Sequence, residues 1–137
     1  MLHSLIVKDY MEASLVTFRP DQGVLAAIRK LVDMRASGAP VLDHTGDLVG
    51  YLSEKDCLKV AVGSSYHGEF GGNVSEYMTT GVVSVDMDTS ILDVAKMFLS
   101  APYKCYPVVT ENRLVGQISR HDVLRAIDHI TEKASFA

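Results

Sequence analysis

An internal repeat sets the narrowest limits on how this 137-residue chain can fold. The segment GYLSEKD at 50–56 returns as GQISRHD at 116–122, and VKDYM at 7–11 returns as VSEYM at 74–78. The early segments are 67 residues apart and the later motifs are 66 apart, so the second copy lacks one residue in the polar turn before its motif. Turns tolerate such deletions. We therefore expect two copies of one structural unit that share a core.

The hydrophobic periodicity changes in the same order within each copy. A short β-branched run predicts a strand, apolar residues at helical spacing predict a helix, a polar turn between apolar runs predicts a strand pair, and a second helix follows. The expected strands are 16–18, 39–43 and 48–53, and then 82–85, 106–110 and 113–118. The first helices are marked by Val24, Leu25, Ile28, Leu31 and Val32, and by Ile91, Val94, Ala95, Phe98 and Leu99, and the second helices are expected at about 54–62 and 120–132.

Two acidic residues, Asp21 and Asp88, stand just before the first helix of each copy. An acidic side chain at this place can accept hydrogen bonds from the free N–H groups of a helix. We therefore expect these two aspartates to cap the helices.

The pattern predicts a mixed α/β (α+β) fold made of two β-α-β-β-α units. A single three-stranded unit would leave one face of its sheet in water, so we expect the two to pack sheet to sheet with pseudo-twofold symmetry. The copies are expected at 1–62 and 74–137, joined by a glycine-rich linker at 63–73 that has no usable periodicity.

Composition excludes several classes of function. A formal net charge of −4 gives no support for non-specific nucleic-acid binding, which needs basic residues. The two cysteines, Cys57 and Cys105, have no CxxC spacing and indicate buried thiols in a reducing compartment. Neither a signal peptide nor an apolar run long enough for a membrane span is present, so we expect a cytoplasmic protein.

The repeated motif is open to a purely structural interpretation. Ser53, followed three residues later by Asp56 and then by an apolar run, fits a capping box at the start of a helix. Ser119 and Asp122 fit it equally well. Capping alone would account for all four side chains without any ligand.

A binding role is the second interpretation of the same motif. Gly50 and Gly116 stand at a fixed distance before the cap, and a ligand pressed against a strand needs a residue without a side chain. A helix N-terminus attracts anions. A hydroxyl and a carboxylate there suit a ribose phosphate, because the carboxylate can accept hydrogen bonds from two ribose hydroxyls.

Other chemistry finds little support in the sequence. The five histidines, at 3, 44, 67, 121 and 129, show no metal-ligand spacing. No nucleophile elbow, catalytic triad or phosphate-cradling loop can be named. Tyr103 and Tyr106 flank Lys104 and are compatible either with an aromatic platform for a base or with packing at a helix-to-strand junction. We therefore expect no enzyme activity and no metal.

Taken together, the repeated units and motifs resemble a known protein family. The two β-α-β-β-α units, APV and YPV on the middle strands, and GYLSEKD and GQISRHD at the last junctions are similar to a tandem pair of cystathionine β-synthase (CBS) domains, a Bateman module. The resemblance spans residues 7 to about 130. It implies a stand-alone, non-catalytic module that senses metabolites or energy state and binds AMP, ADP, ATP or S-adenosylmethionine as a regulatory ligand. It also implies a homodimer and a protein target that the sequence does not identify.

The resemblance assigns site residues in both copies. Asp56 and Asp122 should hold ribose hydroxyls, with Ser53 and Ser119 near the ribose or phosphate, and Thr17 and Ser84 should face the adenine. The segments before the middle-strand proline also line the clefts, and Lys55, Arg120 and His121 lie in the motifs. The expected ligand-binding residues are Thr17, Ser37, Gly38, Ala39, Ser53, Lys55, Asp56, Ser84, Lys104, Cys105, Tyr106, Ser119, Arg120, His121 and Asp122.

Each cleft is expected to draw on both copies. Thr17 and the 37–39 segment should share a ligand with Ser119 and Asp122. Ser84 and the 104–106 segment should share one with Ser53 and Asp56. The cleft with Arg120 offers the better phosphate site, and one or two clefts can be occupied. The alternative function is a structural protein–protein interaction module without a physiological nucleotide ligand.

Overall fold

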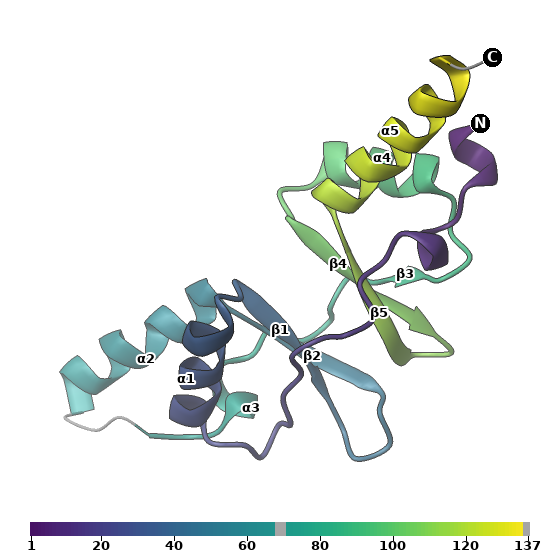
Figure 1. Cartoon of the computed structure of the whole chain (residues 1–137). Helices are drawn as coiled ribbons and strands as arrows, with labels where there is room; N and C mark the ends of the chain where they lie inside the picture. Colours follow the sequence, from purple (N-terminus) through teal and green to yellow (C-terminus); the bar gives the residue numbers. More distant parts are fainter. Residues whose placement is uncertain (68–70, 136–137) are drawn as a thin grey trace. The chain divides into compact units, whose positions relative to one another are not determined.

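The computed structural model describes residues 1–67 and 71–135, which form two compact units (Figure 1). The central unit is Val16–Val82. The terminal unit joins Met1–Leu15 to Val83–Ala137. Helices and strands alternate in both units, which confirms the predicted mixed α/β class.

The central unit contains a two-stranded antiparallel sheet with helices packed against it. Its elements are α1 (Val24–Met34), β1 (Gly38–Leu42), β2 (Leu48–Ser53), α2 (Glu54–His67) and α3 (Val74–Tyr77). Apolar residues at helical spacing on α1 and at alternate positions of β2 meet in one core. The buried members of that core are Phe18, Ala27, Leu31, Ala39, Val41, Leu52 and Val74.

The terminal unit contains a three-stranded sheet in the order β3-β4-β5, in which β3 is parallel to β4 and β4 is antiparallel to β5. Figure 1 shows α4 and α5 together on one side of this sheet. The elements are the 3-10 helices η1 (Leu2–Ser4) and η2 (Val7–Asp9), β3 (Val85–Asp86), α4 (Ile91–Ser100), β4 (Cys105–Thr110), β5 (Arg113–Ser119) and α5 (Arg120–Ser135). Its core includes Val7, Ile91, Val94, Tyr106, Val108, Ile118 and Ala126.

Each sheet is extended by a segment from the start of the other copy. Thr79 pairs with Tyr51 beside β2, and Glu12 pairs with Gln117 beside β5. Both bridges have two backbone hydrogen bonds of 2.9 Å. The compact units therefore do not follow the order of the sequence copies, and the boundaries drawn at 62 and 74 remain an interpretation of the repeat.

The first strand of each copy is shorter than predicted. In the central unit, the expected strand 16–18 is reduced to a single parallel bridge between Phe18 and Val41. In the terminal unit, only Val85 and Asp86 form β3. The two are equivalent, because Val85 pairs with Val108, the counterpart of Val41.

Three predictions about helices were incomplete or wrong. Helix α2 continues to His67, so part of the expected linker is helical, while residues 68–70 lie outside the described residues. The short helices η1, η2 and α3 were not expected. The predicted caps were wrong, because α1 begins after Gly23, without a side-chain cap, and the Ser90 hydroxyl caps α4 by accepting from the Asp93 N–H at 3.1 Å.

Candidate functional site

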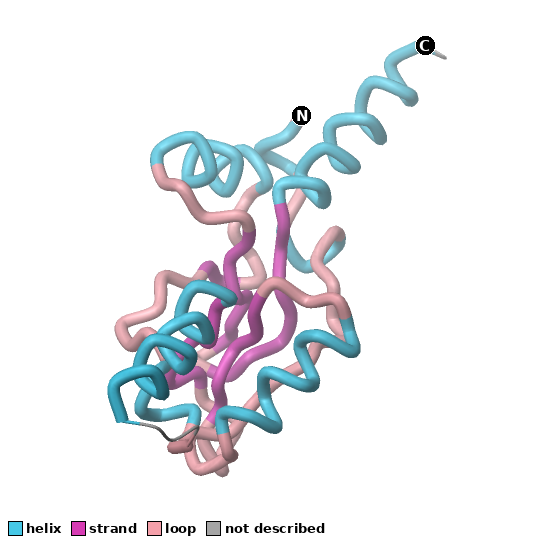
Figure 2. The backbone as a smooth tube through the Cα atoms, turned by 90° about the vertical axis from the view of Figure 1, so that its left-hand side faces the viewer, coloured by secondary structure: helices cyan, strands magenta, loops and turns pink. Residues whose placement is uncertain are grey.

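Both repeated motifs stand where a strand runs directly into a helix. Figure 2 shows β5 passing into α5 without an intervening loop, and β2 meets α2 in the same way. The Ser53 hydroxyl accepts from the Asp56 N–H at 3.1 Å, and the Asp56 carboxylate accepts from the Ser53 N–H at 3.0 Å. The corresponding distances for Ser119 and Asp122 are 3.2 and 2.9 Å. Both motifs are thus complete capping boxes.

Two further donors surround the Asp56 carboxylate in the central unit. The Lys59 ammonium lies 3.1 Å from Oδ1, and the Thr79 hydroxyl lies 3.4 Å from Oδ1 and 3.3 Å from Oδ2. Burial raises the pKa of the Asp56 carboxyl, but hydrogen bonds from the Ser53 N–H and from Lys59 outweigh burial and hold that pKa below its ordinary value. The side chain therefore stays ionised while it is only 6% exposed.

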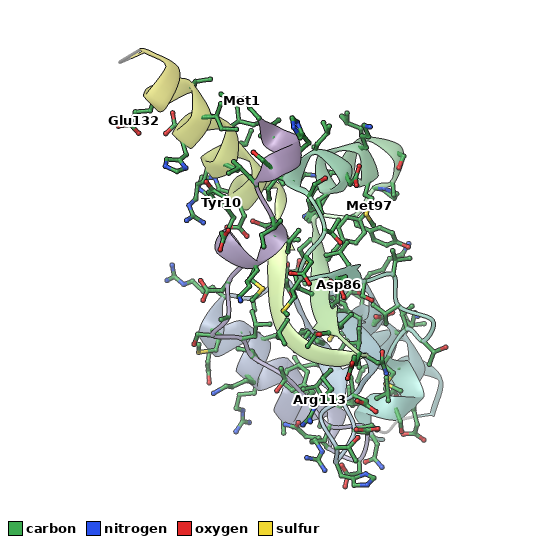
Figure 3. The ribbon with its side chains drawn as sticks, turned by 90° about the vertical axis from the view of Figure 1, so that its right-hand side faces the viewer. Met1, Tyr10, Asp86, Met97, Arg113 and Glu132 are labelled. Carbon is green, nitrogen blue, oxygen red and sulfur yellow. The ribbon has the colours of Figure 1, made fainter. Side chains whose placement is uncertain are left out.

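The Asp122 carboxylate in the terminal unit has a different neighbourhood. Arg125 donates to Oδ1 at 3.0 Å, and the Ser119 hydroxyl donates to Oδ2 at 3.0 Å. Arg125 also donates to the Tyr10 carbonyl at 3.4 Å and lies over the Tyr10 ring. The Tyr10 hydroxyl is 2.6 Å from His129 Nδ1, so the N-terminal segment is held against α5 (Figure 3).

The glycines of the motif have a structural explanation that the sequence did not reveal. A Cβ on Gly50 would lie 2.5 Å from Met78 Sδ and 3.1 Å from the Thr79 carbonyl oxygen. A Cβ on Gly116 would lie 2.6 Å from Met11 Sδ and 2.9 Å from the Glu12 carbonyl oxygen. The chain itself crosses these glycines, so they no longer argue for a ligand pressed against the strand.

The other predicted residues of the central unit lie around the start of α2. Gly38 pairs with Ser53, and the Glu54 N–H donates to the Ser37 carbonyl at 3.0 Å. Ser37 and Lys55 are exposed, while Ala39 is fully buried and belongs to the core. Thr17 is exposed and directly precedes the bridged residue Phe18.

The terminal unit repeats this arrangement at the start of α5. Cys105 pairs with Ser119, and the Arg120 N–H donates to the Lys104 carbonyl at 3.3 Å. Ser84, half-buried, directly precedes β3. Lys104, Arg120 and His121 are exposed, as a phosphate site requires.

Tyr106 does not form an exposed aromatic platform. Its side chain is 2% exposed, its ring contacts those of Phe98 and Tyr103, and its hydroxyl donates to the Met97 carbonyl at 3.1 Å. Burial raises the pKa of this phenol. Packing in the core therefore explains the Tyr106 side chain.

The expected groupings across the copies combine residues of both units and stay predictions. Within the central unit, a pocket of about 310 Å³ is lined by Ile28, Leu31, Val32, Arg35, Ala36, Ser37, Glu54 and Cys57. Burial raises the pKa of the Cys57 thiol, which Asp56 and Glu54 raise further. The described residues hold no cluster of histidine, cysteine and acidic side chains suited to a metal ion. Among them, no helix is long and apolar enough to cross a bilayer.

Comparison with known families decides the assignment that the repeat suggested. The CBS domain family matches residues 7–63 and 74–129, the two copies in order. The chain belongs to the CBS domain family. The predicted resemblance is confirmed, and the match covers the motifs at 50–56 and 116–122.

Three relatives show how far the likeness extends. The chain is 27% identical to CBSX2, a CBS-pair protein from Arabidopsis thaliana whose crystal structure was determined in complex with AMP, with a TM-score of 0.82 over 93% of this chain and 99% of that one. It shares the fold of the MJ0100 CBS pair, in complex with 5′-methylthioadenosine and S-adenosyl-L-methionine, at 23% identity and a TM-score of 0.75 over 90% and 96%. It is 24% identical to the uncharacterized protein MJ1225 of Methanocaldococcus jannaschii over 88% of this chain but spans only 42% of MJ1225.

The sequence pattern did not identify three residues that contact the motif carboxylates Asp56 and Asp122. Lys59 and Arg125 follow the motif aspartates by three positions and are equivalent in the two copies, a spacing that favours ion pairs on a helix. Thr79 follows the repeated YM, where the first copy has Glu12. The repeat could have drawn attention to this difference, but only the fold brings Thr79 to Asp56.

Proposed function

We propose that this CBS pair is a non-catalytic regulatory module that binds an adenosine ligand, namely AMP, ADP, ATP or S-adenosylmethionine. The observation that carries the proposal is the similarity to CBSX2, a protein whose crystal structure was determined in complex with AMP. This similarity extends over nearly the full length of both chains. The bound adenosine compound regulates the module, and no cofactor is required.

The two strand-to-helix junctions supply groups of the right chemistry. A motif carboxylate accepts hydrogen bonds from ribose hydroxyls, and the positive end of the helix together with exposed Lys104 and Arg120 attracts a phosphate. Thr17 and Ser84 face the base in this proposal. Ser37, Gly38 and Lys55 of the central unit, and Cys105 and His121 of the terminal unit, complete the candidate contacts.

Regulation follows from differential binding. A ligand that contacts both copies stabilises the arrangement in which they bind it, and a partner surface that differs between arrangements then reports the ligand. We propose that this partner is a protein in the cytoplasm and that the module works as a homodimer, with neither nucleic acid nor a membrane as its target.

A structural interaction module without a nucleotide ligand is the second candidate. Two observations favour it, because the capping boxes explain the serines and aspartates and the crossing Met11 and Met78 explain the glycines. Ligand binding must therefore be tested by a method that separates lost binding from lost capping.

The test is isothermal titration calorimetry with AMP, ADP, ATP, S-adenosylmethionine and NADH on the wild-type chain and on Asp56→Asn and Asp122→Asn. Asparagine keeps a carbonyl oxygen that can accept the cap hydrogen bond, whereas alanine would remove the cap as well. Asp43→Asn is a matched control, since Asp43 accepts hydrogen bonds from Thr45 and Asp47 in the turn between β1 and β2. We expect saturable binding of at least one adenosine compound, weakened by a motif variant and unchanged in the control.

Absence of binding by every compound at millimolar concentration would favour the structural module instead. Chromatography of the ligand after prolonged incubation checks the non-catalytic part of the proposal. Recovery of unchanged ligand is expected, and a product that requires the folded chain would overturn it.

A further inference from the structure

One tyrosine of the repeat makes different contacts in the two units. The repeated YM places Tyr10 in the first copy where the second copy has Tyr77. The Tyr10 hydroxyl lies 2.6 Å from His129 Nδ1 on α5. The Tyr77 hydroxyl instead donates to the Gly71 carbonyl at 3.1 Å, within its own segment. Of these two hydroxyls, that of Tyr10 therefore ties a leading segment to the helix that begins with a motif.

A second contact links the same segment to the motif carboxylate. Arg125 donates to Asp122 Oδ1 at 3.0 Å and to the Tyr10 carbonyl at 3.4 Å. Its guanidinium carbon lies 6.0 Å from the centre of the Tyr10 ring, within the range of a cation–π contact. Lys59, the equivalent residue of the central unit, pairs with Asp56 at 3.1 Å, and among the described residues its ammonium has no further hydrogen bond or ring contact. The cation beside the carboxylate is therefore held at a second place in the terminal unit.

This second attachment bears on how firmly the Asp122 carboxylate is oriented. Oδ2 accepts from the N–H and the hydroxyl of Ser119, and Oδ1 accepts from Arg125, so the arginine fixes the second oxygen. The Arg125 side chain is 54% exposed, and an exposed ion pair of a long side chain loses much of its strength to solvent and to side-chain entropy. Because the Tyr10 ring and carbonyl already hold the guanidinium, less of this entropy remains to be lost when a ligand binds.

We propose that Tyr10 and Arg125 are positioning residues, through which the N-terminal segment 7–12 orients Asp122 for the ligand of the terminal motif. The inference rests on the proposed function, in which a motif carboxylate contacts the ligand, and it adds the residues that control this contact. By linkage, the ligand stabilises the docked segment by the same factor by which the docked segment raises the ligand's affinity. A protein partner that draws residues 7–12 away from α5 then weakens ligand binding, which gives this site a means of regulation.

The binding test is isothermal titration calorimetry with AMP, ADP, ATP and S-adenosylmethionine. Tyr10→Leu keeps an apolar side chain against the core but removes the ring and the hydroxyl, and it should weaken the tightest of these ligands by about threefold to tenfold. Tyr10→Phe keeps the ring beneath Arg125 and should fall between Tyr10→Leu and the wild-type chain. Tyr77→Leu is the matched control, and Ser90→Ala controls for lost stability, because it removes the cap of α4 in the same unit. Both controls should bind within about twofold of the wild-type chain.

Hydrogen exchange followed by mass spectrometry gives a readout that a purely structural role of Tyr10 would not move. The saturating ligand should slow amide exchange of residues 7–12 more in the wild-type chain than in Tyr10→Leu, whereas its effect on residues 74–79 should be the same in both proteins. Equal slowing of 7–12 in the two proteins, or an affinity of Tyr10→Leu within twofold of wild type, overturns the inference and leaves the proposed function intact. If none of the four compounds binds the wild-type chain, the proposed function fails and the positioning role fails with it.

Discussion

Individual residues of the repeated motif have structural roles that must be separated from any role in binding. Asp56 is the clearest case, because it is a buried carboxylate whose partners all come from its own unit. The sequence predicted the capping pairs Ser53–Asp56 and Ser119–Asp122, since the S-x-x-D spacing is local. It could not predict Thr79, because a contact across 23 residues depends on the tertiary fold.

The acid dependence of stability reports the ionised state of Asp56. The pKa of Asp56 in the folded chain lies below the ordinary 3.8. The stability that the ionised carboxylate contributes is therefore present above pH 3.8 and is lost as the pH falls through the folded pKa. The free energy of unfolding, measured with urea at pH 7 and at pH 3, should fall more for the wild-type chain than for Asp56→Asn. Equal losses in the two proteins would show that the Asp56 charge does not stabilise the fold.

Replacement of the motif glycines tests why they are there. Gly50→Ala and Gly116→Ala should each lower the free energy of unfolding by about 1–3 kcal/mol, because the added methyl meets a methionine sulfur and a backbone carbonyl. Gly63→Ala on α2 is the matched control, since its Cβ would have no neighbour within 4 Å, and it should be neutral or stabilising. Urea denaturation measures all three, and tolerance of alanine at 50 and 116 would restore the case for a ligand at these positions.

Helices and strands were largely predictable from periodicity, whereas their ends were not. The apolar faces of α1 and α4 and the strand pairs β1–β2 and β4–β5 lie where the pattern placed them. The caps were misassigned, because Asp21 and Asp88 match the preferred residue type but the backbone enters each helix later, at Gly23 and Ser90.

The corrected cap of α4 gives a test of how this helix begins. Ser90→Ala should destabilise the chain by about 1 kcal/mol, since it removes the acceptor for the Asp93 N–H. Asp88→Ala should have a clearly smaller effect. Thermal or urea unfolding of both variants decides between the two positions, and a larger effect at Asp88 would reinstate the original prediction.

The chain as a whole is organised by the repeat, yet its compact units exchange their leading segments. Val7 is fully buried in the core of the terminal unit, and Glu12 pairs with β5 of the same unit. Sequence similarity between copies cannot show this exchange, because a leading segment resembles its counterpart whichever sheet it joins. The family and the fold class were predictable, while the partners of residues 7–12 and 74–79 were not.

Loss of the N-terminal segment should therefore affect the far end of the sequence. Deletion of residues 2–12 removes Val7 from the core and exposes Gln117 on β5, so amide hydrogens of 105–119 should exchange much faster. Those of 38–53, in the central unit, should change little. Hydrogen exchange followed by mass spectrometry measures both segments, and faster exchange confined to 38–53 would contradict the composition of the units.

A crystal structure of the chain grown with AMP would join the fold, the family and the proposed site in one observation. We predict AMP whose ribose hydroxyls lie within hydrogen-bond distance of a motif carboxylate, Asp56 or Asp122. An AMP whose ribose contacts neither aspartate, or crystals without bound AMP at millimolar concentration, would contradict this account.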